Sequence, residues 1–201
     1  LADLAAKAGM PAVALTDTNA MFAALEFSEY AVKAGVQPII GCQLALGYVP
    51  EEQGKRPEPP APVVLLAQSE TGWMNLMKLN SCAYLDAEGQ LPQVTVEELA
   101  RHSAGLICLT GGADGPVGRL LQAGQQTKAQ ALLSRLAAIY PGRLYVELQR
   151  HPGDAGQPEA EKLTERGHVE MAYALDLPLV ATNDVYFPKS DLYEAHDALI
   201  C

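Results

Sequence analysis

Apolar residues occur along the chain in short uninterrupted runs, separated by longer segments with helical periodicity. Each run has the length of one buried strand, and Gly or Pro flanks several of them. The pattern predicts six strands, at residues 11–16, 38–46, 63–67, 105–109, 144–148 and 179–182. It predicts helices at residues 1–9, 21–34, 69–85, 127–140 and 158–175, a short helix from residue 95, and a last helix from residue 190.

Ser and Thr residues stand where several of these helices would begin, which is typical of N-caps. They are Ser69, Thr95, Thr127 and Ser190. Thr95 is followed three residues later by Glu98, the spacing of a capping box. Residues 50–62 are rich in proline and charged side chains, and this composition predicts an exposed loop.

Buried strands that alternate with helices indicate an α/β protein with a parallel sheet covered by helices. A (β/α) barrel and a doubly wound sheet both fit this pattern. In either architecture, functional groups follow the C-terminal ends of the strands. Those positions are residues 16–19, 41–43, 110–112, 147–149 and 182–184. Leu65 and Val180 lie inside apolar runs and are expected to be equivalent core positions.

Charge and cysteine usage narrow the possible functions. The 201 residues include 14 Lys plus Arg and 24 Asp plus Glu, for a net charge of -10, and the basic residues are not clustered. Binding to a phosphate backbone needs clustered cations, so we expect weak DNA binding or none. The 4 cysteines lie in apolar stretches without a CxxC pair, which predicts core thiols in a reducing, cytoplasmic compartment.

Both ends of the sequence interrupt a helical pattern, at Leu1 and at Cys201. We therefore expect a single domain over residues 1–201 that is a fragment of a longer protein.

Five segments carry a further signal. They are residues 14–19 with 24–27, residues 35–43, residues 64–79, residues 105–112, and residues 180–186 with 195–197. The first contains Thr-Asp-Thr-Asn, and the last contains Asn-Asp-Val-Tyr. In this order and spacing they resemble the PHP domain (polymerase and histidinol phosphatase type) of bacterial DNA polymerase III alpha subunits.

The resemblance implies a distorted seven-stranded (β/α) barrel whose first strand is missing from this chain. It also implies a parent DNA-directed DNA polymerase, a nucleotidyltransferase of DNA replication with Mg²⁺ in a separate active site outside this chain. The expected partners are the remainder of the alpha subunit, the proofreading exonuclease subunit, and DNA through the parent protein. This domain would be a structural and docking module without a cofactor of its own.

In the family, His, Asp, Glu and Cys side chains at strand ends hold a multinuclear metal centre. Matching the motifs residue by residue, two ligand positions keep a carboxylate, at Asp17 and Asp184. Five others carry a residue that is a poor ligand: Thr18, Gln43, Pro62, Gly112 and Tyr186. A metal cluster needs several anionic or imidazole donors. The resemblance therefore implies an eroded site with no catalytic residue and no bound metal.

The remaining polar residues have structural interpretations. Asp17 and Asp184 are expected to cap helices or bind loop amides, and Glu147 to be a hydrogen-bonding group at a strand end. His196 is expected to be packed, His102 and His168 to be exposed, and His151 to begin a loop. Two other functions stay open. One is an active metal-dependent phosphoesterase or 3′–5′ exonuclease domain, and the other is the PHP domain of the related error-prone polymerase.

Overall fold

The computed structural model describes residues 1–48, 59–85, 91–151, 158–185 and 189–200. The strands within these ranges are β1 (Ala12–Leu15), β2 (Gln37–Gly47), β3 (Ala61–Ala67), β4 (Val94–Thr95), β5 (Leu106–Leu109), β6 (Leu144–Gln149) and β7 (Leu179–Thr182). The helices are α1 (Ala2–Lys7), α2 (Ala24–Lys33), α3 (Glu70–Leu85), α4 (Val96–Arg101), α5 (Pro116–Gln122), α6 (Gln126–Ile139), α7 (Glu159–Ala174) and α8 (Tyr193–Ile200), with a 3₁₀ turn at Ser190–Leu192 before α8.

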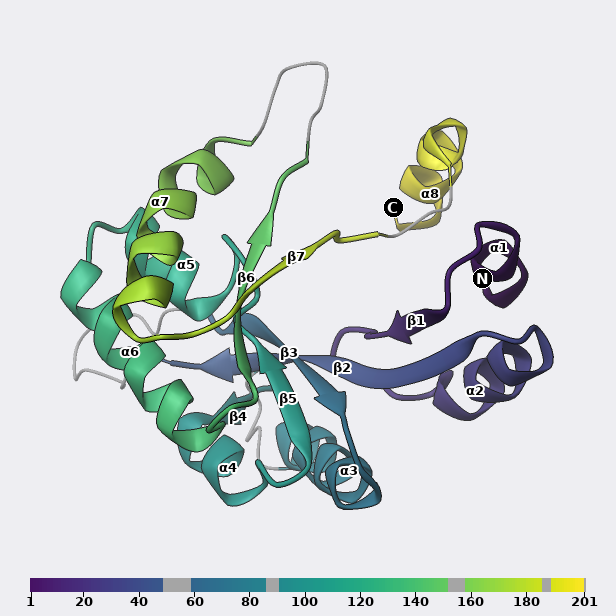
Figure 1. Cartoon of the computed structure of the whole chain (residues 1–201), viewed down its shortest axis with the longest axis horizontal. Helices are drawn as coiled ribbons and strands as arrows, with labels where there is room; N and C mark the ends of the chain where they lie inside the picture. The colour runs from purple at the N-terminus through teal and green to yellow at the C-terminus, as the bar shows by residue number, and fades with distance from the viewer. Residues whose placement is uncertain (49–58, 86–90, 152–157, 186–188, 201) are drawn as a thin grey trace.

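The strands form one curled sheet in the order β1-β2-β3-β5-β6-β7, and the short strand β4 pairs with β2. Helices lie around the outside of this sheet, as Figure 1 shows. Each of the six predicted strands lies on the main path, so the α/β prediction and these six strands are confirmed for the described residues, and β4 is an additional short strand. β1 and β7 are the two edges of the sheet, which forms an open half-barrel.

The prediction of an all-parallel sheet is wrong at β3. This strand runs antiparallel to β2 and to β5, whereas β1–β2, β5–β6 and β6–β7 are parallel pairs. Because Leu46 pairs with Ala61, the chain leaves β2 and enters β3 at the same end of the sheet. A buried apolar run has the same composition in either direction, so the sequence pattern alone does not show the reversal.

The core lies between the central strands and the helices α3 to α7. Its fully buried side chains include Leu44, Leu65, Leu79, Leu106, Leu136 and Val146. The edge strands are less buried, since Ala14 in β1 and Leu179 in β7 are exposed and Val180 is only partly buried. Leu65 and Val180 are therefore not equivalent core positions.

The helix starts agree only in part with the caps predicted from sequence. The Ser69 hydroxyl accepts a hydrogen bond from Gly72 N–H at 3.2 Å, and Thr95 and Glu98 form a complete capping box. Thr127 lies inside α6, whose N-cap is Gln125 without a side-chain cap, so the Thr127 prediction is wrong. The Ser190 side chain and most of the predicted loop 50–62 are outside the described residues.

Sequence periodicity did not indicate two short elements. One is β4, whose two residues are too few to show alternation. The other is α5, which begins with Pro116 directly after Gly115. Among the described helices, none is long and apolar enough to cross a membrane.

Candidate functional site

Two of the positions where the family carries metal ligands bind each other, one just after β1 and one in the middle of β2. Gln43 Nε2 donates a hydrogen bond to Thr18 Oγ1 across 3.2 Å. The backbone places them together, because Thr18 and Gln43 form an isolated parallel bridge just beyond the β1–β2 ladder. Both side chains are neutral, and each satisfies part of the other's hydrogen-bonding capacity.

Asn19, which the sequence analysis did not single out, fixes the turn that carries Thr18. Its backbone is left-handed, with φ of 50°, a conformation that Asn tolerates better than most residues. Its Oδ1 accepts a hydrogen bond from Ala45 N–H at 3.0 Å, and its carbonyl accepts one from the Tyr84 hydroxyl at 2.8 Å. The Asp-Thr-Asn sequence directly after a strand was the available signal for this turn.

Asp17 is exposed, and no side-chain hydrogen bond or ion pair joins it to another described residue. The expectation that its carboxylate binds a loop amide or caps a helix is therefore not met among these residues. Its backbone carbonyl instead accepts from Gln43 N–H at 3.2 Å and from the Cys42 thiol at 3.3 Å. Burial raises the pKa of Cys42 to about 11, and the nearby Asp17 charge adds to this shift, so the thiol stays protonated.

Glu147 joins three strand ends on the other side of the sheet. Its Oε2 accepts a hydrogen bond from Gly111 N–H at 2.8 Å, and its Oε1 accepts one from the Thr182 hydroxyl. Its own N–H donates to Thr110 Oγ1 at 2.9 Å. The interpretation of Glu147 as a strand-end hydrogen-bonding group is confirmed. Burial raises the pKa of this carboxyl, the bonds from Thr182 and Gly111 oppose the shift, and the Asp184 charge adds to it.

The ligand positions at Pro62 and Gly112 also lie at this end of the sheet. Pro62 lies here because β3 runs in the reverse direction. Because β3 is antiparallel, its start lies beside the segment that follows β5. Gly111 has φ of +79°, and a Cβ there would lie 2.1 Å from the Pro62 carbonyl oxygen, so only glycine fits. A Cβ at Gly112 would lie 2.9 Å from Gln149 Oε1. Neither Pro62 nor Gly112 offers a side-chain donor atom to a metal.

A second polar cluster lies beside Asp184. Glu161 is buried, and its Oε2 accepts a hydrogen bond from His151 N–H at 3.0 Å while its Oε1 contacts His151 Nδ1. His151 Nε2 in turn accepts from Asp184 N–H at 3.4 Å. His151 therefore connects α7 to the segment after β7, a role beyond the predicted start of a loop. The burial of Glu161 could have been predicted from its helical spacing to Thr164, His168 and Met171, which form the buried face of α7.

His168 is 1% exposed, so the prediction that it is an exposed residue is wrong. It belongs to the buried face of α7, and burial lowers its pKa to about 4, which keeps the ring neutral. Its Nε2 has no hydrogen-bond partner among the described residues. His102 and His196 are both partly buried, so His102 is less exposed than predicted.

The donors at the described strand ends do not suit a multinuclear metal centre. Among the described residues, no group of three or more His, Cys, Asp or Glu side chains is arranged to hold a metal ion. Thr18 and Gln43 are neutral and paired, and Glu147 already accepts from two strand ends. Tyr186, the last altered ligand position, is outside the described residues. The chemical role of these side chains is to link neighbouring strands by hydrogen bonds.

Comparison with known proteins agrees with this architecture. The chain is 50% identical over 203 aligned positions to the DNA polymerase III subunit alpha of Caulobacter vibrioides, covering 98% of this chain and 17% of the relative. It is 37% identical to the subunit of the same name from Rickettsia bellii, covering 100% of this chain and 16% of that relative. The chain thus spans about a sixth of the length of these proteins.

A solved structure supports the fold. A protein from Bifidobacterium adolescentis that is named as a metal-dependent phosphoesterase superimposes with a TM-score of 0.55, at 11% identity, over 91% of this chain and 80% of that one. At this identity the likeness concerns the fold alone. The family model described as "PHP domain" matches residues 1–151, three quarters of the sequence. The chain belongs to the PHP domain family.

Proposed function

We propose that this chain is the N-terminal PHP domain of a bacterial DNA polymerase III alpha subunit and takes part in DNA replication. The support is similarity along nearly its whole length to alpha subunits that are about six times longer. The names of these relatives favour the main replicase over the related error-prone polymerase. On this proposal, DNA extension uses Mg²⁺ at a site elsewhere in the parent protein.

Within that protein, the domain serves as a structural and docking module and performs no hydrolysis of its own. The observation that carries this proposal is the hydrogen bond between Thr18 and Gln43, at two positions where the family has metal ligands. A metal-activated water needs a metal held by several charged or imidazole donors. Here Thr18, Gln43 and Glu147 form hydrogen bonds within the protein, which favours this role over an active phosphoesterase or 3′–5′ exonuclease.

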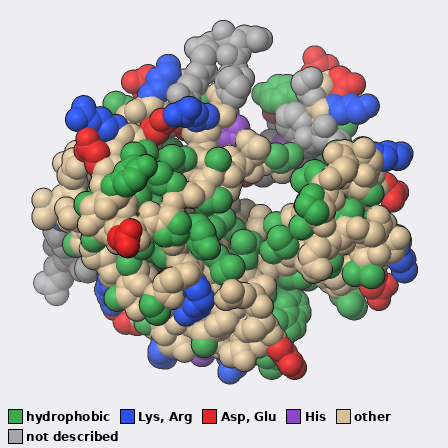
Figure 2. All heavy atoms as spheres, in the orientation of Figure 1, with side chains coloured by type: hydrophobic (Ala, Val, Ile, Leu, Met, Phe, Trp, Pro, Cys, Tyr) green, Lys and Arg blue, Asp and Glu red, His purple; other side chains and the backbone are tan. Residues whose placement is uncertain are grey.

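The partners that fit this role are the remainder of the alpha subunit and the proofreading exonuclease subunit. DNA is a poor direct partner, because the net charge of -10 repels a phosphate backbone. On the face drawn in Figure 2, Lys and Arg side chains are scattered, and several lie beside Asp or Glu side chains. Such an arrangement offers no basic stripe on that face to a nucleic acid.

The test compares the full-length polymerase with its Asp17→Asn and Asp184→Asn variants. We expect unchanged rates of primer extension, no phosphoesterase or primer-degrading activity, and no Zn, Mn or Fe retained after dialysis. Glu147→Ala is the matched control, since it removes a site carboxylate that has structural bonds and should lower the melting temperature.

The proposal fails if dialysed enzyme keeps several transition-metal ions per chain. It also fails if a hydrolytic activity disappears in Asp17→Asn and depends on added Mn²⁺. Either result would show that the altered site still performs chemistry.

A further inference from the structure

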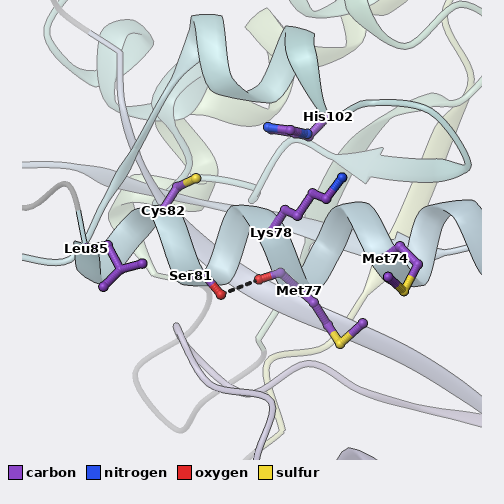
Figure 3. Close-up of a pocket in the computed structure, with 7 residues that line it drawn as sticks. All are labelled: Met74, Met77, Lys78, Ser81, Cys82, Leu85 and His102. Carbon is purple, nitrogen blue, oxygen red and sulfur yellow. Dashed lines mark hydrogen bonds between the residues drawn. The ribbon is translucent and has the colours of Figure 1, made fainter.

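The outer face of α3 forms a groove of about 420 Å³. Six residues of this helix line it, at spacings of one helical turn: Met74, Met77, Lys78, Ser81, Cys82 and Leu85. His102, the C-cap residue of α4, lines it from the neighbouring helix. Figure 3 shows Lys78 and Cys82 projecting from α3 towards His102, while Met77 and Leu85 project away from it. From Met74 to Leu85 the groove extends along α3 for about 16 Å.

This face of α3 is more apolar than packing in the domain requires. The helix already buries Leu76, Leu79 and Ala83 completely on its other face. The outer face of a surface helix usually carries charged residues, but α3 contains only Glu70 in its first turn and Lys78. Met74 is 49% exposed and Leu85 is 81% exposed. These exposed apolar side chains lie on the same face of α3, so a partner laid along this helix would contact both of them.

The chemistry of the groove selects the kind of partner. Methionine side chains are flexible and polarisable, and they adapt to apolar side chains of different shapes. Lys78 carries a positive charge in the groove, and no carboxylate is among the described residues that line it. In a chain with a net charge of -10 this local sign is the reverse of the whole, so it is complementary to an acidic side chain.

We propose that the α3 groove binds an amphipathic helical segment of another polypeptide, with apolar side chains against Met74, Met77 and Leu85 and a carboxylate against Lys78. The length of the groove corresponds to about three turns of helix, and helix-in-groove binding uses apolar side chains at this repeat. The inference concerns a surface separate from the strand-end site and does not depend on the polymerase assignment.

The experiment selects a random peptide library displayed on phage against the 201-residue chain, and then measures the affinities of the enriched peptides by fluorescence anisotropy. We expect enriched peptides to combine apolar residues at spacings of three and four with one Asp or Glu. Lys78→Glu should weaken them about tenfold, because it replaces an attraction by a repulsion. Met74→Asp should weaken them as well, and replacing the peptide carboxylate by Lys should restore binding to Lys78→Glu.

Lys128→Glu is the control, since it makes the same charge change on the exposed surface of α6. It should leave the affinities within about twofold. The proposal is overturned if the enriched peptides lack a carboxylate, or if they bind Lys78→Glu and Met74→Asp as well as the original chain. It is also overturned if the groove instead mediates dimers that Met74→Asp dissolves, or if full-length polymerase does not bind the peptides because its own chain covers α3.

Discussion

Truncation of Leu65 in β3 should destabilise the domain far more than truncation of Val180 in β7. Leu65 has no exposed surface, and it lies in the middle of the sheet, opposite Cys42 of β2 and Cys108 of β5. Val180 is partly exposed and lies in an edge strand that pairs on one side with β6. The two changes, Leu65→Ala and Val180→Ala, therefore compare a central position with a peripheral one.

The magnitudes follow from the carbon atoms removed and their burial. Leu65→Ala removes three buried carbons, worth about 2.4 kcal/mol at about 0.8 kcal/mol each. The cavity left between paired strands adds to this, so we expect a loss of about 3–4 kcal/mol in the free energy of unfolding. Val180→Ala removes two carbons that are already partly in water, and about 1 kcal/mol is expected. The sequence alone predicts about 2–5 kcal/mol for both.

The assay is urea denaturation of the 201-residue chain, followed by circular dichroism. A change in the midpoint with an unchanged slope reports the stability difference directly. The reasoning is refuted if Val180→Ala loses as much stability as Leu65→Ala, or if Leu65→Ala loses less than about 1 kcal/mol. In full-length polymerase, Leu65→Ala should also weaken attachment of the exonuclease subunit, if the domain is the docking module proposed above.

Three further predictions concern the site, a helix cap and DNA. Burial raises the pKa of Glu147 in the folded state above its ordinary value of 4.5, so stability should rise as the pH falls from the folded-state pKa to the ordinary one. Glu147→Gln should make the melting temperature depend less on pH in this range. The same dependence of melting temperature on pH in both proteins would contradict this prediction. Thr95→Ala should lower the free energy of unfolding by about 1 kcal/mol because it removes the capping box. Thr127→Ala should change it by less than about 0.5 kcal/mol because Thr127 caps no helix. Equal losses for the two variants in urea denaturation would show that the cap assignment is wrong. Primer–template DNA should bind the isolated chain with a Kd above about 1 µM at physiological salt in fluorescence anisotropy, and submicromolar binding would contradict the charge argument.

Local chemistry made several parts of the fold predictable. The run at residues 105–109 became β5 almost unchanged, because a short apolar segment between turn residues has few other ways to be buried. Thr95 and Glu98 formed the predicted capping box, since both partners lie within one turn of the same helix. In such cases the interaction that determines the structure is contained in a few consecutive residues.

Interactions between distant residues were not predictable in the same way. The direction of β3 depends on which end of β2 the chain returns to, and the burial of His168 depends on how α7 packs. At the site, the sequence marked Thr18 and Gln43 as poor ligands, but the bond between them appears only when β1 and β2 are side by side. The contact of Glu161 with His151 likewise needs α7 placed against the end of β6.

The Thr18–Gln43 pair also makes the two positions dependent on each other. A change of Thr18 to His alone would replace the hydroxyl that now accepts from the Gln43 amide. A change of Gln43 to Glu alone would replace the donating amide by a carboxylate, and the Thr18 hydroxyl would then become the donor. Each single step towards a metal site therefore changes or removes the Thr18–Gln43 hydrogen bond without supplying the other metal ligands. Restoring coordination by design requires both substitutions together with changes at the other altered positions, Pro62, Gly112 and Tyr186. A double-mutant cycle at Thr18 and Gln43 measures how far these two positions depend on each other.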